Sequence, residues 1–148
     1  MHLRRVKASD REVYLKMVHD FYHSPAVLHP VPDEHFERTF EEILRSDVYS
    51  DGFLLEDEDG RCMGYAVTAK GFSQECGGQF VWVDELYVLP DHQGKGVGTE
   101  ALRQLQAYYP DCKRFRLEVE PDNEDAARLY QRLGFEVLPY RQYVMDKF

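Results

Sequence analysis

The most restrictive feature of the chain is its longest and most apolar strand candidate, residues 79–89, which leads directly into a turn with three glycines. The turn, residues 93–98, reads Gln-Gly-Lys-Gly-Val-Gly, and the apolar spacing after it predicts a helix over about 96–108. Glycines leave backbone N–H groups uncovered, and the first N–H groups of a helix carry a partial positive charge. The turn therefore suits an anion, most plausibly a pyrophosphate, bound where a strand passes into a helix.

Of three phosphate-binding patterns that use such a turn, only one matches. A Walker A loop needs Ser or Thr after Lys95, where a glycine stands, and the dinucleotide pattern GxGxxG needs glycine at position 99, where threonine stands. The third pattern, Q/R-x-x-G-x-G/A, is complete in Gln93, Gly96 and Gly98. The alternative is a turn that caps a helix and binds no ligand.

The rest of the chain predicts an α/β fold in the order β-α-α-β-β-β-α-β-α-β-β, with a mixed central sheet of six to seven strands flanked by helices. The strand candidates are residues 3–6, 53–55, 62–67, 79–89, 114–120, 135–137 and 142–145. Ser9 and Glu12 fit a capping box at the first helix, and Asn123 and Gly134 bound the last one.

The first two helices carry apolar faces that should pack on this sheet. The expected inward residues are Val13, Met17 and Phe21 in the first helix, and Phe36, Phe40, Ile43 and Leu44 in the second. Between the second and third strands, Asp59-Gly60 suits a hairpin turn.

Charge and cysteine content exclude several classes of protein. The 148 residues hold 27 Asp and Glu against 18 Lys and Arg, and the net charge of −9 argues against nucleic acid as a partner. Cys62, Cys76 and Cys112 form no CxxC pair, so we expect reduced thiols, no metal site and a cytoplasmic location. No apolar run is long enough for a bilayer, and no signal peptide is evident. We expect one domain over residues 1–148 and no membrane partner.

Two segments together resemble the GNAT superfamily of N-acetyltransferases. Residues 84–98 look like that family's fourth strand and pyrophosphate loop. Leu117-Glu118-Val119 and the residues that follow look like its fifth strand and next helix, through Asn123, Ala126, Ala127, Leu129-Tyr130 and Leu133-Gly134-Phe135. The resemblance covers about residues 80–137 and implies a GNAT fold. It specifies the superfamily and leaves the substrate open.

The resemblance implies acetyl-CoA as co-substrate. The family's loop holds the CoA pyrophosphate on backbone amides, which corresponds here to Gln93, Gly94, Lys95, Gly96, Val97, Gly98 and Thr99. The main chain of its fourth strand pairs with the pantetheine arm, which corresponds to Leu86, Tyr87 and Val88. On the last helix, Asn123, Ala126 and Tyr130 are expected near that arm. For Asn123 the alternative role is an N-cap.

The resemblance also implies a catalytic acid and a base. Tyr130 corresponds to the family's acid, which protonates the leaving thiolate; a core aromatic is the alternative. A base is needed because an alkylamine with a pKa near 10.4 is neutral in only about one molecule in two thousand at pH 7. The candidates are Asp84, Glu85 and Glu118. Strand alternation places Asp84 and Glu85 on opposite faces unless a bulge shifts the parity.

The resemblance further implies that a proline-rich aromatic segment, residues 21–30, walls the acceptor site. Its candidate substrate contacts are Phe21, Tyr22 and His29. His23 and His35 are further candidates, with surface or structural roles as the alternative.

The sequence therefore predicts an N-acetyltransferase that moves an acetyl group directly to a primary amine of a small molecule or peptide. One alternative is an acyl-CoA-binding sensor of the same fold without turnover. A dinucleotide oxidoreductase is a weaker alternative because of the threonine at position 99. Since many members of the superfamily dimerise, the resemblance also allows a homodimer.

Overall fold

A computed structural model describes all 148 residues, which form two compact units, Met1–Glu118 and Val119–Phe148. Each unit is described by itself. That both belong to a single domain stays a prediction. No helix in either unit has the length and apolar character needed to cross a lipid bilayer.

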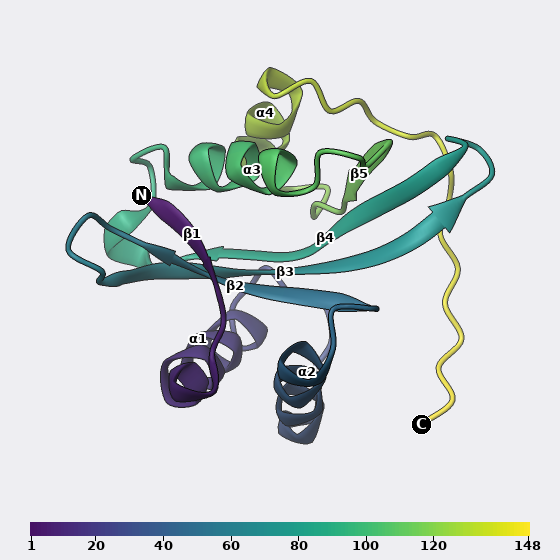
Figure 1. Ribbon diagram of the computed structural model, residues 1–148. Helices are drawn as coiled ribbons and strands as arrows, with labels where there is room; N and C mark the ends of the chain where they lie inside the picture. Colours follow the sequence, from purple (N-terminus) through teal and green to yellow (C-terminus); the bar gives the residue numbers. More distant parts are fainter. The chain divides into compact units, whose positions relative to one another are not determined.

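The first unit is built on a five-stranded sheet in the order β1-β2-β3-β4-β5 (Figure 1). Its strands are β1 (His2–Arg5), β2 (Ser50–Glu56), β3 (Cys62–Ser73), β4 (Gly78–Val88) and β5 (Arg114–Leu117). Neighbours are antiparallel except β4 and β5, which are parallel. The hairpin between β2 and β3 turns at Gly60, whose φ of 76° needs glycine, as Asp59-Gly60 predicts.

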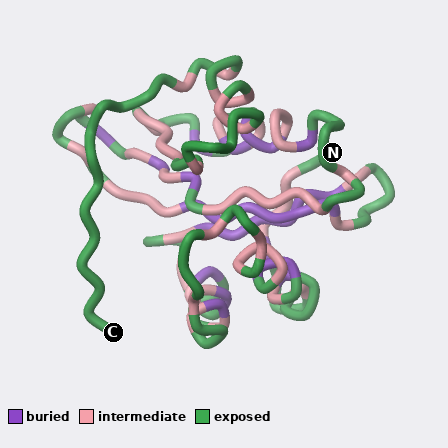
Figure 2. The backbone as a smooth tube through the Cα atoms, turned by 180° about the vertical axis from the view of Figure 1, so that it is seen from behind, coloured by how far each residue is buried: buried purple, intermediate pink, exposed green.

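Helices cover both faces of this sheet (Figure 1). One face carries α1 (Arg11–Tyr22) and α2 (Asp33–Arg45), and the other carries α3 (Val97–Tyr108). Short 3₁₀ turns, η1 (Ala8–Asp10) and η2 (Pro90–His92), precede α1 and follow β4. Figure 2 shows buried backbone concentrated in the sheet and in the helix faces that meet it. The α/β class and the helix positions are therefore confirmed.

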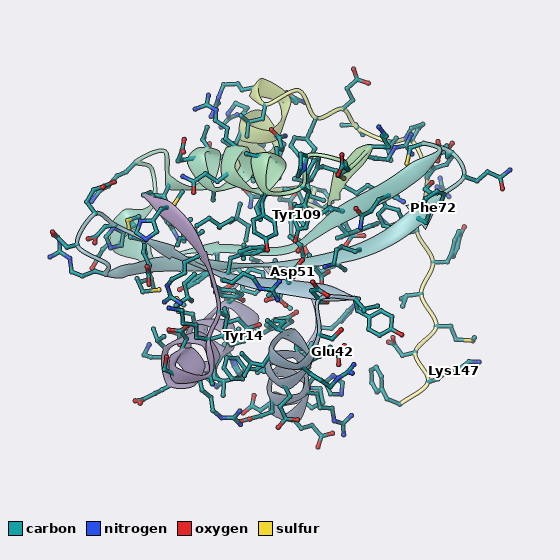
Figure 3. All side chains as sticks on the ribbon, in the orientation of Figure 1. Tyr14, Glu42, Asp51, Phe72, Tyr109 and Lys147 are labelled. Carbon is teal, nitrogen blue, oxygen red and sulfur yellow. The ribbon has the colours of Figure 1, made fainter.

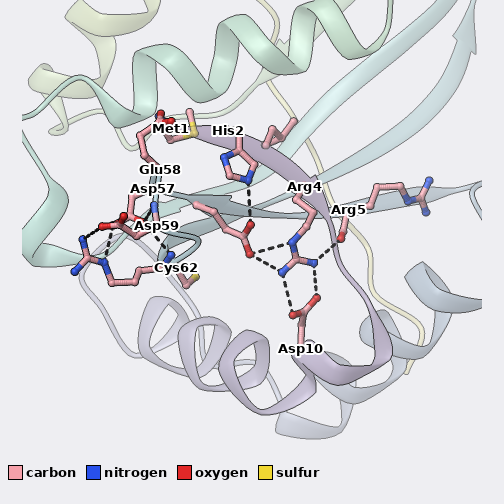
Figure 4. Close-up of polar contacts among 12 residues, drawn as sticks. Met1, His2, Arg4, Arg5, Asp10, Asp57, Glu58, Asp59 and Cys62 are labelled. Atoms are coloured by element: carbon pink, nitrogen blue, oxygen red, sulfur yellow. Dashed lines mark hydrogen bonds and ion pairs between the residues drawn. The ribbon is translucent and has the colours of Figure 1, made fainter.

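The start of α1 differs from its prediction because Asp10, not Ser9, organises the turn. The Asp10 carboxylate accepts two hydrogen bonds from the Arg4 guanidinium, at 2.9 and 3.1 Å (Figure 4). It also accepts one from the Lys7 backbone N–H at 2.7 Å. Arg4 also binds Glu56 on β2 at 2.6 Å, and these bonds lower the pKa of both carboxyl groups. The capping box of Ser9 with Glu12 is therefore wrong.

The inward faces of α1 and α2 are confirmed in part. Met17, Phe36, Phe40 and Ile43 are buried as expected, whereas Val13 and Leu44 are exposed. In place of Val13, Tyr14 is buried, and its ring packs against Phe40 and Tyr65 with ring centroids 5.2 and 5.5 Å apart. At the start of α1 the residue that faces the core is therefore Tyr14, one position after the predicted Val13.

The second unit holds one helix, α4 (Glu124–Arg132), and a segment without regular structure. Gly134 follows α4 with φ of 88°, and the Phe135 N–H donates to the Tyr130 carbonyl oxygen at 3.0 Å, so the predicted C-cap is confirmed. The predicted strands at residues 135–137 and 142–145 are wrong. Their alternating side chains mimic a strand, but a strand needs a hydrogen-bonded neighbour and these residues form no ladder. The sheet therefore has five strands, not six or seven.

A buried ionic cluster joins three strands of the first unit to the loop after α3. Asp51 on β2 is 1% exposed and binds the Lys70 Nζ and the Tyr109 hydroxyl, both at 2.7 Å (Asp51 and Tyr109 in Figure 3). Arg5 on β1 pairs with its other oxygen at 2.6 Å. Thr68 closes the cluster on the Tyr109 hydroxyl at 2.7 Å.

We expect Asp51→Ala to destabilise the protein by about 3–5 kcal/mol, because it leaves the enclosed Lys70 ammonium without its partner. Urea unfolding followed by circular dichroism measures the change. The control is Asp59→Ala, which removes a fully solvated partner of Arg61 and should cost at most about 1 kcal/mol. Equal losses in the two variants would contradict a structural role for the Asp51 cluster.

Candidate active site

One extra residue in β4 sets the geometry of the candidate site. Glu85 pairs with Val67 on β3, whereas Val83 pairs with the next residue of β3, Thr68, so Asp84 has no partner in the ladder. Two residues of β4 thus oppose one position of β3, which defines a β-bulge.

The bulge brings two consecutive carboxylates to one face of the sheet. Glu85 lies opposite Val67, which belongs to the core beneath α1 and α2. Leu86, one residue later, packs with the core beneath α3. Regular alternation would then have placed Asp84 and Glu85 on opposite faces, but both line a single cavity on the α1–α2 side.

This cavity has a volume of about 220 Å³ and is formed by two helices, the segment before α2, and β4. Its lining comprises Tyr14, Val18, Tyr22, Val31, His35, Phe36, Thr39, Asp84 and Glu85. The volume lies below the common range of roughly 300–1,000 Å³ for small-molecule sites, which favours a slender ligand.

The cavity contains only some of the predicted acceptor residues. Tyr22 lines it, but Phe21 packs instead against Tyr65 and Tyr87, at centroid distances of 6.3 and 6.0 Å. His29 is exposed and is not part of the lining. The sequence analysis missed Val31, in the segment before α2, and four helical residues that look like core on a helix packed against a sheet: Tyr14, Val18, Phe36 and Thr39.

Glu85 is held firmly by two tyrosine hydroxyls. The Tyr22 hydroxyl donates to its Oε1 at 2.6 Å and the Tyr65 hydroxyl to its Oε2 at 2.7 Å. Burial raises the pKa of Glu85, while the two hydroxyl donors oppose this by stabilising the anion. The side chain is thus fixed in position with both oxygens engaged.

Asp84 has a different environment, although it is the next residue. It is exposed to solvent and makes no hydrogen bond within the protein. The protein atoms around it raise the pKa of its carboxyl group, and the negative charge of Glu118 raises that pKa further. Asp84 is therefore a free carboxylate with raised basicity that water can reach. Glu118 itself is exposed and does not line the cavity.

Beyond the bulge, one edge of β4 is open. Parallel pairing with β5 runs only from Phe80 with Arg114 to Val83 with Leu117 and stops one residue before the bulge. The predicted strand over 114–120 is shortened accordingly. Three predicted cofactor residues, Leu86, Tyr87 and Val88, pair with β3 alone, which leaves backbone groups on their other edge for an extended ligand.

The glycine turn after β4 has the geometry of an anion site. Gly94 and Gly96 have φ of 70° and 80°, values that favour glycine, and Gly96 immediately precedes α3. Hydrogen bonds in the turn use the N–H groups of His92, Gln93 and Glu100, so those of residues 94–99 point to no internal acceptor. The turn therefore fits a phosphate or pyrophosphate group.

Two side chains of the turn stabilise its shape. The Gln93 side-chain amide donates to the Val88 carbonyl oxygen at 2.9 Å, and the Lys95 ammonium donates to the Asp91 carbonyl oxygen at 2.7 Å. Val97, the first residue of α3, is buried, and Gly98 and Thr99 follow it in the first turn of the helix. The anion would be met by backbone amides and by the charge of Lys95.

The second unit carries the remaining predicted residues on α4. Asn123 is the N-cap, because its side-chain oxygen accepts from the Ala126 N–H at 3.1 Å. Tyr130 lies two turns further along the same helix, with its ring 6.0 Å from that of Phe135. Within the whole chain, no group of three or more His, Cys, Asp or Glu side chains is arranged to hold a metal ion.

We expect Asp84 to titrate above the ordinary aspartate pKa. The substitution Glu118→Gln should lower the pKa of Asp84, because it removes a like charge near that carboxylate. Carbon-13 NMR of the carboxyl groups against pH measures both effects. Asp10, whose pKa Arg4 holds low, is the internal control and should not respond. An Asp84 pKa at or below the ordinary value would contradict this description of the cavity.

Three comparisons place the chain among known proteins. A spermine/spermidine N(1)-acetyltransferase of Bacillus subtilis (strain 168) is 39% identical over 59 residues, which cover 38% of this chain and 39% of the relative. The match thus spans about two fifths of that protein. A thialysine N-epsilon-acetyltransferase of Mus musculus is 25% identical over 150 residues, which cover 92% of this chain and 84% of the relative.

Among solved structures, AAC(6')-Iy in complex with the bisubstrate analogue CoA-S-monomethyl-acetylneamine has the same fold. Its TM-score is 0.77 at 20% identity, over 99% of this chain and 98% of that one. The family model of the acetyltransferase (GNAT) family matches residues 15–135, which include α1 from residue 15 onward, α2, the bulge, the glycine turn and α4. The chain belongs to the GNAT family of acetyltransferases.

Proposed function

We propose that this protein transfers the acetyl group of acetyl-CoA to a primary amine of a small molecule. The observation that carries the proposal is the bulge in β4, which directs a free carboxylate into a cavity on the strand that leads to the anion-binding turn. Family membership and the amine acetyltransferases among the relatives support the same reaction.

Asp84 is the proposed base. A protonated alkylamine is not nucleophilic, so one proton must leave its nitrogen before or during attack. The oxygens of Asp84 make no hydrogen bond within the protein, and its raised pKa makes it a better proton acceptor than an ordinary aspartate. Glu85 is less suited because both of its oxygens already accept hydrogen bonds from tyrosine hydroxyls. Glu118 acts on Asp84 through its charge.

The co-substrate would be held by the turn and by the open edge of β4. Acetyl-CoA supplies the acetyl group as a thioester. The backbone N–H groups of residues 94–99 would bind its pyrophosphate, and the main chain of residues 86–88 would align its arm. A β4 N–H directed at the thioester carbonyl would stabilise the negative charge that develops there.

Tyr130 is assigned as the acid that donates a proton to the leaving sulfur. This role rests on the resemblance of α4 to the corresponding helix of the family. In the same assignment Asn123 contacts the arm of the co-substrate in addition to capping α4. Transfer is proposed to be direct, because Cys62, Cys76 and Cys112 all lie outside the cavity lining. We place the reaction in the cytoplasm.

The proposal is tested by thiol release from acetyl-CoA with a panel of primary amines. We expect amine-dependent release in the wild type and a loss of about 10²–10⁴-fold in Asp84→Asn, which keeps the shape of the side chain but cannot accept the proton. Glu41→Gln, on the exposed side of α2, is the control and should retain full activity. CoA binding without any amine-dependent release would favour the sensor alternative.

Cofactor binding is tested separately with Gly96→Ala, which places a side chain at φ of 80°. We expect a stability loss of about 1–2 kcal/mol and at least about tenfold weaker CoA binding by calorimetry, because the strained turn moves its amides. Gly60→Ala is a matched control at φ of 76° in the β2–β3 hairpin, where an added Cβ also meets nothing. It should lose similar stability and bind CoA normally. Unchanged CoA affinity in Gly96→Ala would contradict the site.

A further inference from the structure

The charges that face the cavity are unbalanced. Of its nine lining residues two are carboxylic acids, Asp84 and Glu85, and none is Lys or Arg. The other side chains are apolar, aromatic or neutral hydrogen-bonding groups, apart from His35. Asp84 is exposed to solvent, but Glu85 is partly buried and no Lys or Arg lines the cavity, so a positive charge beside Glu85 is expected from the ligand.

The tyrosines of the cavity respond to this negative charge. Burial raises the pKa of Tyr14 and Tyr22, and the charge of Glu85 followed by that of Asp84 raises both further. These hydroxyls therefore stay protonated and neutral, and they add no charge to that of the two carboxylates. The rings of Tyr14, Tyr22 and Phe36 also line the cavity, and aromatic faces attract cations.

Counting the charges in the cavity during the reaction distinguishes a monoamine acceptor from an acceptor with a second ammonium group. Before transfer, a monoamine enters as one ammonium against two carboxylates, so it balances only one of the two carboxylate charges. When the proton moves from the ammonium nitrogen to Asp84, the reacting amine and Asp84 both become neutral and Glu85 stays charged. A second ammonium on the acceptor balances Glu85 throughout.

We infer that the acceptor is a short aliphatic diamine or polyamine, whose second ammonium is bound by Glu85 while its reacting amine faces Asp84. This inference rests on the proposed acetyl transfer and assigns Glu85 as the residue that determines specificity. The spacer is short because the two carboxylates are neighbours on one face of β4 and the cavity measures about 220 Å³. An acceptor with a carboxylate in place of the second ammonium would be repelled.

Three amines of one length test the inference on the wild type. They are 1,4-diaminobutane, n-butylamine and 4-aminobutanoate, which differ only in an ammonium, a methyl or a carboxylate at the far end. We expect kcat/KM for the diamine to exceed that for butylamine by about tenfold or more, beyond the factor of two for its two equivalent amines, because a partly enclosed charge pair has a low effective dielectric. 4-Aminobutanoate should be the poorest acceptor.

The variant Glu85→Gln tests whether Glu85 causes the preference for the diamine over butylamine. The amide keeps the length of the side chain and can still bond to both tyrosine hydroxyls, but it carries no charge. We expect the ratio of kcat/KM for the diamine to that for butylamine to fall to about two, whatever the change does to the butylamine rate itself. Glu41→Gln, with the same charge change outside the cavity, should keep the wild-type ratio. A purely structural Glu85 would lower both rates together and leave the ratio unchanged.

Failure of this inference and failure of the proposed function give different results. Acetylation of butylamine or 4-aminobutanoate as fast as the diamine would overturn the diamine assignment and leave the acetyltransferase intact. If no amine is acetylated, calorimetric titration of the protein with the diamine and with butylamine tests whether Glu85 binds a second ammonium. Tighter diamine binding that Glu85→Gln abolishes would support it, and equal binding would overturn it.

Discussion

The single unpaired residue in β4 is the constraint on which the candidate site depends. If Asp84 were paired in a regular ladder, strand alternation would direct Asp84 and Glu85 to opposite faces of the sheet. Only one of the two carboxylates would then reach the cavity. The same bulge ends the pairing between β4 and β5 after Val83 and Leu117. One local irregularity thus creates both the acidic cavity on one face and the open backbone edge beside it.

The cavity is inseparable from the core that supports it. Tyr14 is 1% exposed and packs on Phe40 and Tyr65, yet it also lines the cavity. Tyr65 is fully buried, yet its hydroxyl holds Glu85 in place. The aromatic packing of α1 on β3 therefore positions the carboxylate, which explains why Glu85 keeps one orientation while Asp84, one residue away, remains free.

Sequence patterns predicted those parts of the protein that depend on local chemistry. Gly94 and Gly96 of the turn, Gly60 of the hairpin and Gly134 after α4 all have a positive φ, a conformation for which the sequence supplies glycine. The sequence left open whether Asp84 and Glu85 share a face, because the bulge that brings them together depends on the register between two strands. The helical residues of the cavity look like ordinary core, and the alternation after residue 135 predicted strands for which no partner forms.

The irregular features of the first unit follow one another along a short stretch of chain. From residue 84 to residue 98 the backbone passes through the bulge, the half-paired end of β4, a 3₁₀ turn and two glycines with positive φ before α3 becomes regular. Each departure exposes a carboxylate or backbone polar groups that regular structure would have paired. Stability comes instead from elements outside this stretch, such as the Asp51 cluster and the aromatic core, and this division lets residues 84–98 keep polar groups free for ligands.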